Sequence, residues 1–192
     1  MIKSVVFASA LAGLAAWTVG DRWSPAAGQN DVGIVAQAYD SAALSDQDRD
    51  FMNNAALGGM FEVRESKAAA EKTTTDGIKQ FANQMIDDHT AVNKELAKLA
   101  SDKMVTIPTD LEKSQQKQID DLNQLSGADF DKQYIKDQLD AHKDAVKLFQ
   151  TEINEGQETD VKQFAAHTLP TLQHHLAMVE ALDSGTTVGM GN

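Results

Sequence analysis

The sequence predicts an all-α protein, an up-and-down four-helix bundle with a partly helical connection between its second and third long helices. Two observations lead to this prediction. Four long segments place apolar residues at the spacing of one helix face, and no segment shows the strict alternation of a half-buried β-strand. The composition, 42% hydrophobic and 24% charged over 192 residues, is that of a folded domain. We expect the bundle at 39–183 and a flexible, glycine-rich tail at 184–192.

The first two helices are expected at about 45–72 and 75–103. Ser45, with Asp48 three residues later, is a capping-box pattern that marks a helix start. Gly58 and Gly59 lie inside the first helix, where each costs about 1 kcal/mol relative to alanine, so we expect a neighbouring helix to approach closely there. The inward-facing residues are Phe51, Ala55, Gly58, Glu62 and Ala69 in the first helix, and Ile78, Phe81, Ala82, Met85, His89, Val92, Leu96 and Leu99 in the second.

The connection contains a weaker helix, at about 109–125, that Gly127 helps to end. The third long helix is expected at about 128–154, and Gly156 follows as a normal glycine stop. Its inward-facing residues are Phe130, Tyr134, Gln138, His142, Ala145, Phe149 and Ile153.

The fourth long helix is expected to begin near Thr159 and to kink at Pro170, because proline removes one backbone hydrogen bond and clashes with the preceding turn. Its inward-facing residues are Val161, Phe164, Ala165, Thr168, Leu169, Leu172, His175, Leu176, Val179 and Leu182.

The N-terminal segment 1–38 has the pattern of a secretory signal peptide. Lys3 precedes an uncharged apolar run from Val5 to Val19, which is shorter than the ~20 residues of a membrane-spanning helix. We expect export to the periplasm. Either the segment is cleaved, after Ala38 or near Ala27, or it remains as an N-terminal anchor that associates the protein with the membrane.

Charge and composition exclude several classes of function. The formal net charge of −12 disfavours nucleic-acid binding and adhesion to an anionic membrane surface. The absence of cysteine excludes disulfides, thiolate metal sites, iron–sulfur clusters and thiol catalysis. No P-loop, dinucleotide-binding fingerprint or catalytic serine elbow occurs.

Four side chains with a carboxylate or imidazole group lie on the apolar faces, one in each long helix: Glu62, His89, His142 and His175. Each is near the middle of its helix, so all four can meet at one level of the core. Buried groups of this kind need partners, and one carboxylate with three imidazoles can bind a transition-metal ion: Fe, Zn, Cu or Mn. Two alternatives remain open, a metal-free hydrogen-bonded cluster and a helix rotation that leaves one or two of the residues at the rim.

The predicted site is mononuclear. A di-iron bundle site has a glutamate three residues before the ligand histidine, whereas Ile86, Leu139 and Leu172 occupy those positions here. Glu65 is expected at the surface, and Asp88 and Asp137 are expected to support ligands rather than to bind metal. Of the other polar or soft residues, His167 and His174 are expected to face solvent, and Met85 and Met178 to fill the core rather than to bind copper.

Four blocks of the sequence resemble, in order, those of a domain-of-unknown-function family of exported bacterial proteins labelled predicted outer-membrane proteins. They are FMNNAALGGMFEVRESKAA, FANQMIDDHTAVNKELAKLA, LSGADFDKQYIKDQLDAHKDAVKLFQ and FAAHTLPTLQHHLAMVEAL. The resemblance covers about 45–183 and implies a ferritin-like fold and an exported location, but no activity. Its pattern maps onto Glu62, onto Asp88 with His89, onto His142, and onto the Leu169-Pro170 pair with His175. No segment shows the alternation of transmembrane strands, so we expect no transmembrane barrel and at most peripheral association with the envelope.

These observations favour an exported, ferritin-like bundle that binds one transition-metal ion for metal handling or stress protection. The alternative is a non-catalytic structural or interaction module of the cell envelope that binds no metal. A metal-dependent oxidoreductase is the third hypothesis, and it would need an open coordination position.

Overall fold

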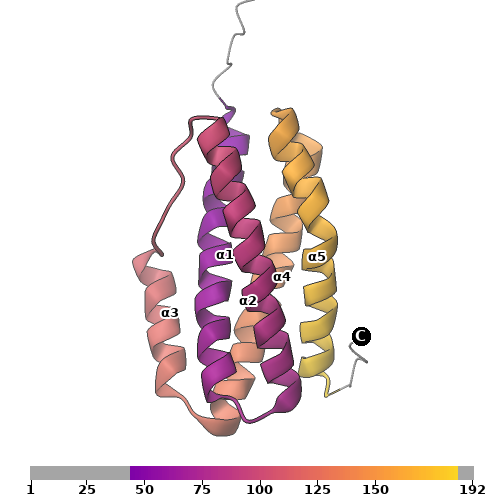
Figure 1. The fold of residues 1–192 in the computed structure, drawn as a ribbon. Helices are drawn as coiled ribbons and strands as arrows, with labels where there is room; N and C mark the ends of the chain where they lie inside the picture. Colours follow the sequence, from indigo (N-terminus) through magenta and orange to yellow (C-terminus); the bar gives the residue numbers. More distant parts are fainter. Residues whose placement is uncertain (1–43, 186–192) are drawn as a thin grey trace, which may run out of the picture. The chain divides into compact units, whose positions relative to one another are not determined.

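A computed structural model describes residues 44–185, which form five α-helices and no strand, and so confirms the all-α prediction. The helices are α1 (Asp46–Lys72), α2 (Asp76–Asp102), α3 (Lys113–Gln124), α4 (Gly127–Glu155) and α5 (Thr159–Asp183) (Figure 1). Within 44–185, no helix combines the length and the hydrophobicity needed to cross a membrane. The signal or anchor segment at 1–38 and residues 186–192 of the expected tail lie outside the described residues.

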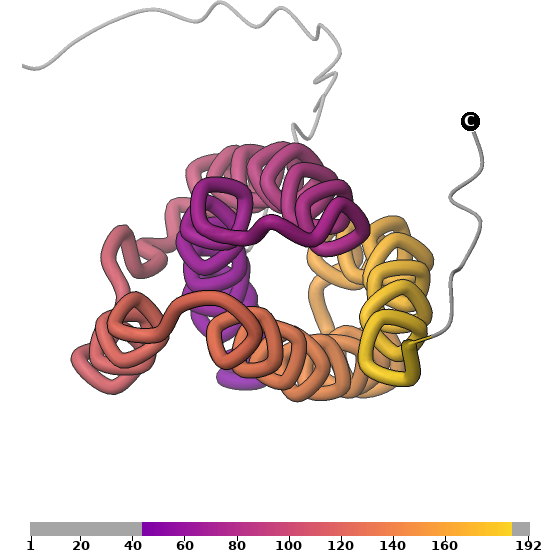
Figure 2. Tube along the Cα trace, turned by 90° about the horizontal axis from the view of Figure 1, so that it is seen from below, coloured from indigo at the N-terminus to yellow at the C-terminus, as the bar shows by residue number. Residues whose placement is uncertain are grey.

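The four long helices pack around a shared core, and α3 lies outside them against α1 and α4 (Figure 2). Helix α1 pairs with α2 and α4 pairs with α5, each as an antiparallel hairpin, while α1 packs on α4 and α2 packs on α5. The segment containing α3 returns along the bundle before α4 begins, so α2 and α4 run in the same direction. The partly helical connection that the sequence predicts between the second and third long helices is therefore present, and it carries the chain back along the bundle.

The start of α1 is fixed by hydrogen bonds that the sequence predicts only in part. The capping box is present: Ser45 Oγ accepts from the Asp48 backbone N–H at 3.1 Å, and Asp48 Oδ2 accepts from the Ser45 N–H at 3.2 Å. The buried Asp48 also accepts, through Oδ1, from the backbone N–H groups of Gln157 and Glu158 at 2.9 and 3.2 Å. One carboxylate therefore caps α1 and holds the α4–α5 turn against it.

A polar layer divides the buried core into two apolar clusters. The first apolar cluster lies at the end where α1 and α5 begin, and includes Phe51, Met52, Leu96, Phe149, Val161, Phe164 and Leu172. The second lies at the opposite end and includes Ala69, Ile78, Phe81, Met85, Phe130, Tyr134, Met178 and Val179. Seven buried polar residues of the four long helices lie between these sets along the sequence, and they form what we call the polar layer: Glu62, Glu65, Ser66, His89, Gln138, His142 and His175.

The two adjacent glycines of α1 differ in their surroundings. A Cβ atom on Gly59 would lie 2.0 Å from Asn93 Oδ1 of α2, so the expected close approach of a neighbouring helix is confirmed there. A Cβ atom on Gly58 would meet nothing within 4 Å, so the same expectation is wrong for Gly58. Gly156 has a φ of −59°, and it leaves room for the Glu152 side chain instead of supplying a left-handed glycine stop.

The glycine pair gives a matched test of the packing between α1 and α2. Gly58→Ala should raise the free energy of unfolding by about 1 kcal/mol, because alanine is the better helix former and the space is open. Gly59→Ala should gain less than this, or lose stability, because the Asn93 side chain has to move. Urea unfolding of the two variants measures the difference, and equal gains in stability would contradict the packing described here.

Candidate metal centre

All four residues predicted for the metal site meet in the polar layer. Glu62 of α1, His89 of α2, His142 of α4 and His175 of α5 have exposed fractions of 3, 3, 0 and 0%. Each helix buries its apolar residues in both clusters, and this sets the rotation that turns the intervening polar residue inward. Among the described residues, none of the four is at the rim.

The three histidine rings surround a common point. Their ring centroids are 5.7 Å apart for His89 and His142, 5.3 Å for His89 and His175, and 5.5 Å for His142 and His175. One nitrogen of each ring lies within 4.8 Å of one nitrogen of each of the others. Three points with that spacing lie at most about 2.8 Å from a shared centre (4.8/√3), so small rotations would reach the ~2.0–2.1 Å of an imidazole–metal bond.

One nitrogen of each ring lies within hydrogen-bond distance of an oxygen atom. His142 Nδ1 lies 2.8 Å from the backbone carbonyl oxygen of Gln138, which can only accept, so this nitrogen carries the hydrogen. His175 Nε2 lies 2.8 Å from Asp88 Oδ2, and His89 Nδ1 lies 3.0 Å from Glu62 Oε2. This arrangement is typical of metal-binding histidines, whose outer N–H is oriented by a carboxylate or a carbonyl.

The second nitrogen of each ring has no partner. His89 Nε2, His142 Nε2 and His175 Nδ1 are buried, and none has a hydrogen-bond partner in the part of the chain that the structure describes. An unsatisfied buried polar atom costs about 1–3 kcal/mol. Three such atoms in one layer therefore indicate a ligand that supplies what the protein does not.

Glu62 lies beside the three imidazoles rather than among their free nitrogens. Its carboxyl group contacts His89 Nδ1 through Oε2, and its Oε1 lies 3.6 Å from His142 Nδ1. Neither of these nitrogens is one of the three that lack a partner. The sequence analysis placed Glu62 on the same level as the histidines, but helical spacing does not define which ring nitrogen a carboxylate meets.

Burial keeps the three imidazoles neutral. It lowers the pKa of His89 well below the usual range, helped by the neighbouring His142 and His175. It also lowers the pKa of His142 to about 4, and lowers that of His175 against the opposing effect of the hydrogen bond to Asp88. Neutral rings keep the nitrogen lone pairs that a metal ion would bind.

The polar layer contains further groups that the sequence analysis placed elsewhere or left without a role. Glu65 is fully buried, which contradicts the expected surface position, and its Oε2 accepts from Gln138 Nε2 at 3.0 Å. Ser66 Oγ and Tyr134 Oη are 2.8 Å apart in the same layer. The position of Glu65, three residues after Glu62 on the same helix face, was the available signal for its burial.

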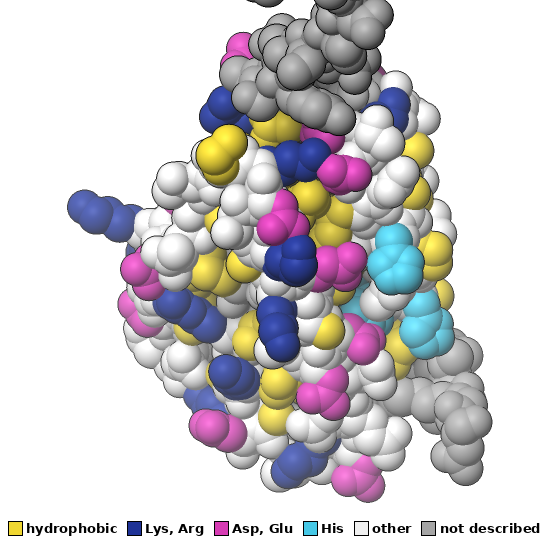
Figure 3. Space-filling view, turned by 45° about the horizontal axis from the view of Figure 1, so that its top comes forward, with side chains coloured by type: hydrophobic (Ala, Val, Ile, Leu, Met, Phe, Trp, Pro, Cys, Tyr) yellow, Lys and Arg dark blue, Asp and Glu magenta, His cyan; other side chains and the backbone are white. Residues whose placement is uncertain are grey.

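The supporting and bystander residues lie as follows. Asp88 contacts His175, as expected of a supporting group, whereas Asp137 accepts from Gln133 and Gln118 at 2.9 and 3.4 Å. His167 and His174 are exposed, and histidine side chains are visible at the surface in Figure 3. Met85 and Met178 lie in the second apolar cluster, as core-filling residues do.

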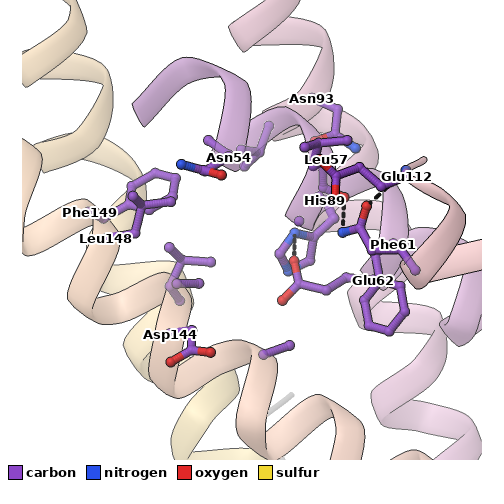
Figure 4. A pocket seen from close by; sticks show the side chains of 18 residues that line it. Asn54, Leu57, Phe61, Glu62, His89, Asn93, Glu112, Asp144, Leu148 and Phe149 are labelled. Atoms are coloured by element: carbon purple, nitrogen blue, oxygen red, sulfur yellow. Dashed lines mark hydrogen bonds and ion pairs between the residues drawn. The ribbon is translucent and has the colours of Figure 1, made fainter. Parts of the chain in front are cut away.

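A cavity of about 480 Å³ connects the polar layer with the surface between α1 and α4. Glu62 and His89 lie at its buried inner end, and Asn54 and Asp144 lie at its exposed outer end (Figure 4). We call this space the vestibule.

The burial of Glu65 predicts a pH effect on stability. Burial, together with the nearby Asp137, raises the pKa of Glu65 to about 8, so the folded state holds a proton that the unfolded chain releases near its ordinary pKa of 4.5. Stability is therefore lost as the pH rises from about 4.5 to about 8. Glu65→Gln should remove this loss, so its free energy of unfolding should rise relative to that of wild type by up to about 3 kcal/mol between pH 5 and pH 8.

Denaturant unfolding at pH 5 and at pH 8 measures this change in stability. Glu71 is exposed on the same helix, and Glu71→Gln is the control for the change in net charge. A difference between Glu65→Gln and wild type that does not change with pH would show that Glu65 is not protonated in the folded protein.

Similar solved structures share the helical architecture. A DUF305 fragment from Deinococcus radiodurans superposes with a TM-score of 0.65 at 9% identity, over 74% of this chain and 98% of that one. CopM in its Cu(I)-bound and Cu(II)-bound forms superposes with TM-scores of 0.60 and 0.58 at 13% identity, in both cases over 72% of this chain and 96% of CopM. At these identities the likeness concerns the fold alone.

The family assignment comes from the sequence itself. No curated protein matches the chain. The family described as "Domain of unknown function (DUF4142)" matches residues 34–182, a span that includes every residue of the polar layer. That description assigns neither an activity nor a location. The chain is therefore a member of the DUF4142 family.

Proposed function

We propose that this protein is an exported, ferritin-like four-helix bundle that binds one transition-metal ion through His89, His142 and His175. The observation behind this proposal is a cluster of three buried imidazole rings, each of which has one nitrogen without a partner and offers one ligand atom within 4.8 Å of those of the other two. A single ion would satisfy all three. Glu62, Asp88 and the Gln138 carbonyl would act behind the ligands, where they already orient the rings.

The chemistry of the donors narrows the choice of ion. Neutral imidazole suits Cu, Zn, Fe and Ni, and the chain has no cysteine to add a thiolate. Without Glu62 as a ligand, the three donor atoms are all imidazole nitrogens. Mn prefers oxygen ligands, so it fits these three donors less well than it fits one carboxylate with three imidazoles. The similar fold of CopM, seen with Cu(I) and with Cu(II), makes copper the first ion to test.

The proposed role is metal handling in the periplasm. Lys3 and the apolar run from Val5 to Val19 support export, by the signal-peptide pattern. A fully buried site suits the holding of an ion more than rapid turnover of a substrate. A metal-free structural or interaction module is the competing function, and the metal titration below separates the two.

The purified chain should bind about one equivalent of copper, and loss of one imidazole should weaken binding by more than ~100-fold. Isothermal titration calorimetry of wild type and His89→Ala measures this. His167→Ala is the matched control, since it removes an exposed histidine, and it should bind as wild type does. Bound ion should also raise the melting temperature of wild type, because it binds only the folded state.

The metal site would be refuted, and the structural module favoured, if wild type bound no Cu, Zn, Fe, Ni or Mn and if none of the five ions changed its melting temperature. Equal losses of affinity in His89→Ala and His167→Ala would place the ion elsewhere.

The supporting carboxylates should matter less than the ligands. Asp88→Asn and Glu62→Gln should each weaken metal binding by ~10–100-fold, because the rings lose an orienting partner but keep their lone pairs. Competition with a chromogenic chelator measures the affinities. If Glu62→Gln costs as much as His89→Ala, then Glu62 is itself a ligand, as the sequence alone suggested.

A further inference from the structure

We infer that the vestibule between α1 and α4 is the path by which cations reach the three imidazoles. The inference rests on the proposed metal site and adds a route and a selectivity to it. The vestibule has a volume of about 480 Å³, and its lining runs from exposed residues of α1 and α4 to the buried pair Glu62 and His89 (Figure 4). This cavity therefore contacts the candidate site.

The charges of the vestibule favour cations. Two exposed carboxylates, Glu112 and Asp144, lie at its mouth. The buried carboxyl group of Glu62 lies at the inner end, where burial raises its pKa to about 8 and so favours its neutral form. None of the described lining residues is a lysine or an arginine. A cleft that is lined by one sign of charge and has apolar walls concentrates ions of the opposite sign.

Two buried oxygen atoms would hold a cation along the way. Glu62 Oε1 and Asn93 Oδ1 are both buried, both belong to lining residues, and neither has a hydrogen-bond partner among the described residues. Asn93 occupies its place because Gly59 has no side chain: a Cβ there would lie 2.0 Å from Asn93 Oδ1. Asp144, Asn93 and Glu62 thus give the vestibule oxygen atoms as well as the imidazole of His89, and hard oxygen ligands suit an ion that is still partly hydrated.

At His175, one ring nitrogen is covered by Asp88, whose side chain is 31% exposed and accepts the ring hydrogen bond at 2.8 Å. An ion that arrived on that side would have to displace this pair. The open space at Gly58 makes the α1–α4 side the easier path.

Gly58 offers a substitution that blocks the vestibule without disturbing the core. A Cβ at this position meets nothing within 4 Å, so the ring of Gly58→Phe can occupy the vestibule while α1 keeps its packing. In stopped-flow mixing with Cu(II), this variant should load at least ~10-fold more slowly than wild type. Its affinity at equilibrium should stay within about threefold. Ala91→Phe, on an exposed position of α2 outside the vestibule, is the matched control and should load at the wild-type rate.

A second readout needs no metal. Diethyl pyrocarbonate is a small neutral reagent for unprotonated imidazoles, and mass spectrometry locates the residues it modifies. Gly58→Phe should protect His89 by at least ~10-fold, while the exposed His167 and His174 serve as internal standards with unchanged rates. Protection of His89 in a protein that binds no metal would support the path and refute the proposed function, so the two failures are distinguishable.

Reversal of the charge at the mouth tests the selectivity. Asp144→Lys should slow copper loading several-fold at low salt, less at high salt, and should leave the modification of His89 by the neutral reagent unchanged. Wild-type rates of both copper loading and His89 modification in Gly58→Phe would overturn the path. Unchanged loading in Asp144→Lys would overturn the selectivity for cations.

Discussion

The structure depends on how a buried polar layer is satisfied between two apolar clusters. Seven polar side chains occupy the level at which a bundle of this length would otherwise bury leucine or phenylalanine. Each of the four long helices contributes at least one of them, so the free-energy cost of burying polar groups is shared among these helices. One nitrogen of each of the three imidazoles is paired with an oxygen atom, and the other has no partner among the described residues. The fold brings the three rings together in this layer.

The packing of the two apolar clusters fixes the relative positions of the three histidine rings. Phe51, Phe149 and Phe164 contact one another in the first cluster, with ring centroids 4.9–6.2 Å apart. In the second, Phe81 lies 6.2 Å from the Tyr134 ring and 6.4 Å from the His142 ring. Close-packed aromatic groups above and below the polar layer limit the rotation of the helices, and therefore of the histidines. Stability and site geometry come from the same contacts.

Helical periodicity in the sequence predicts which residues of each helix face the core. A polar residue on an apolar stripe identifies His89, His142 and His175, and the mid-helix position of each puts them at one level. Periodicity does not control contacts between helices. It gave the same expectation for Gly58 and Gly59, although one faces the vestibule and the other faces Asn93. Glu65 was expected at the surface. Helical spacing does not show that Gln138 of α4 approaches it and gives its carboxyl group a partner inside the bundle. The direction of α4 depended on the path of the connection, which α3 determines by packing on α1.

The most direct test of the account is X-ray absorption spectroscopy of the copper-loaded protein, because it reads the donor atoms themselves. The account predicts a first shell dominated by three nitrogen donors at ~2.0–2.1 Å, with the outer-ring scattering typical of imidazole. In His89→Ala the imidazole count should fall by one. A shell made of sulfur or of oxygen alone, or a spectrum unchanged by the loss of His89, would contradict the claim that the three buried histidines bind one ion.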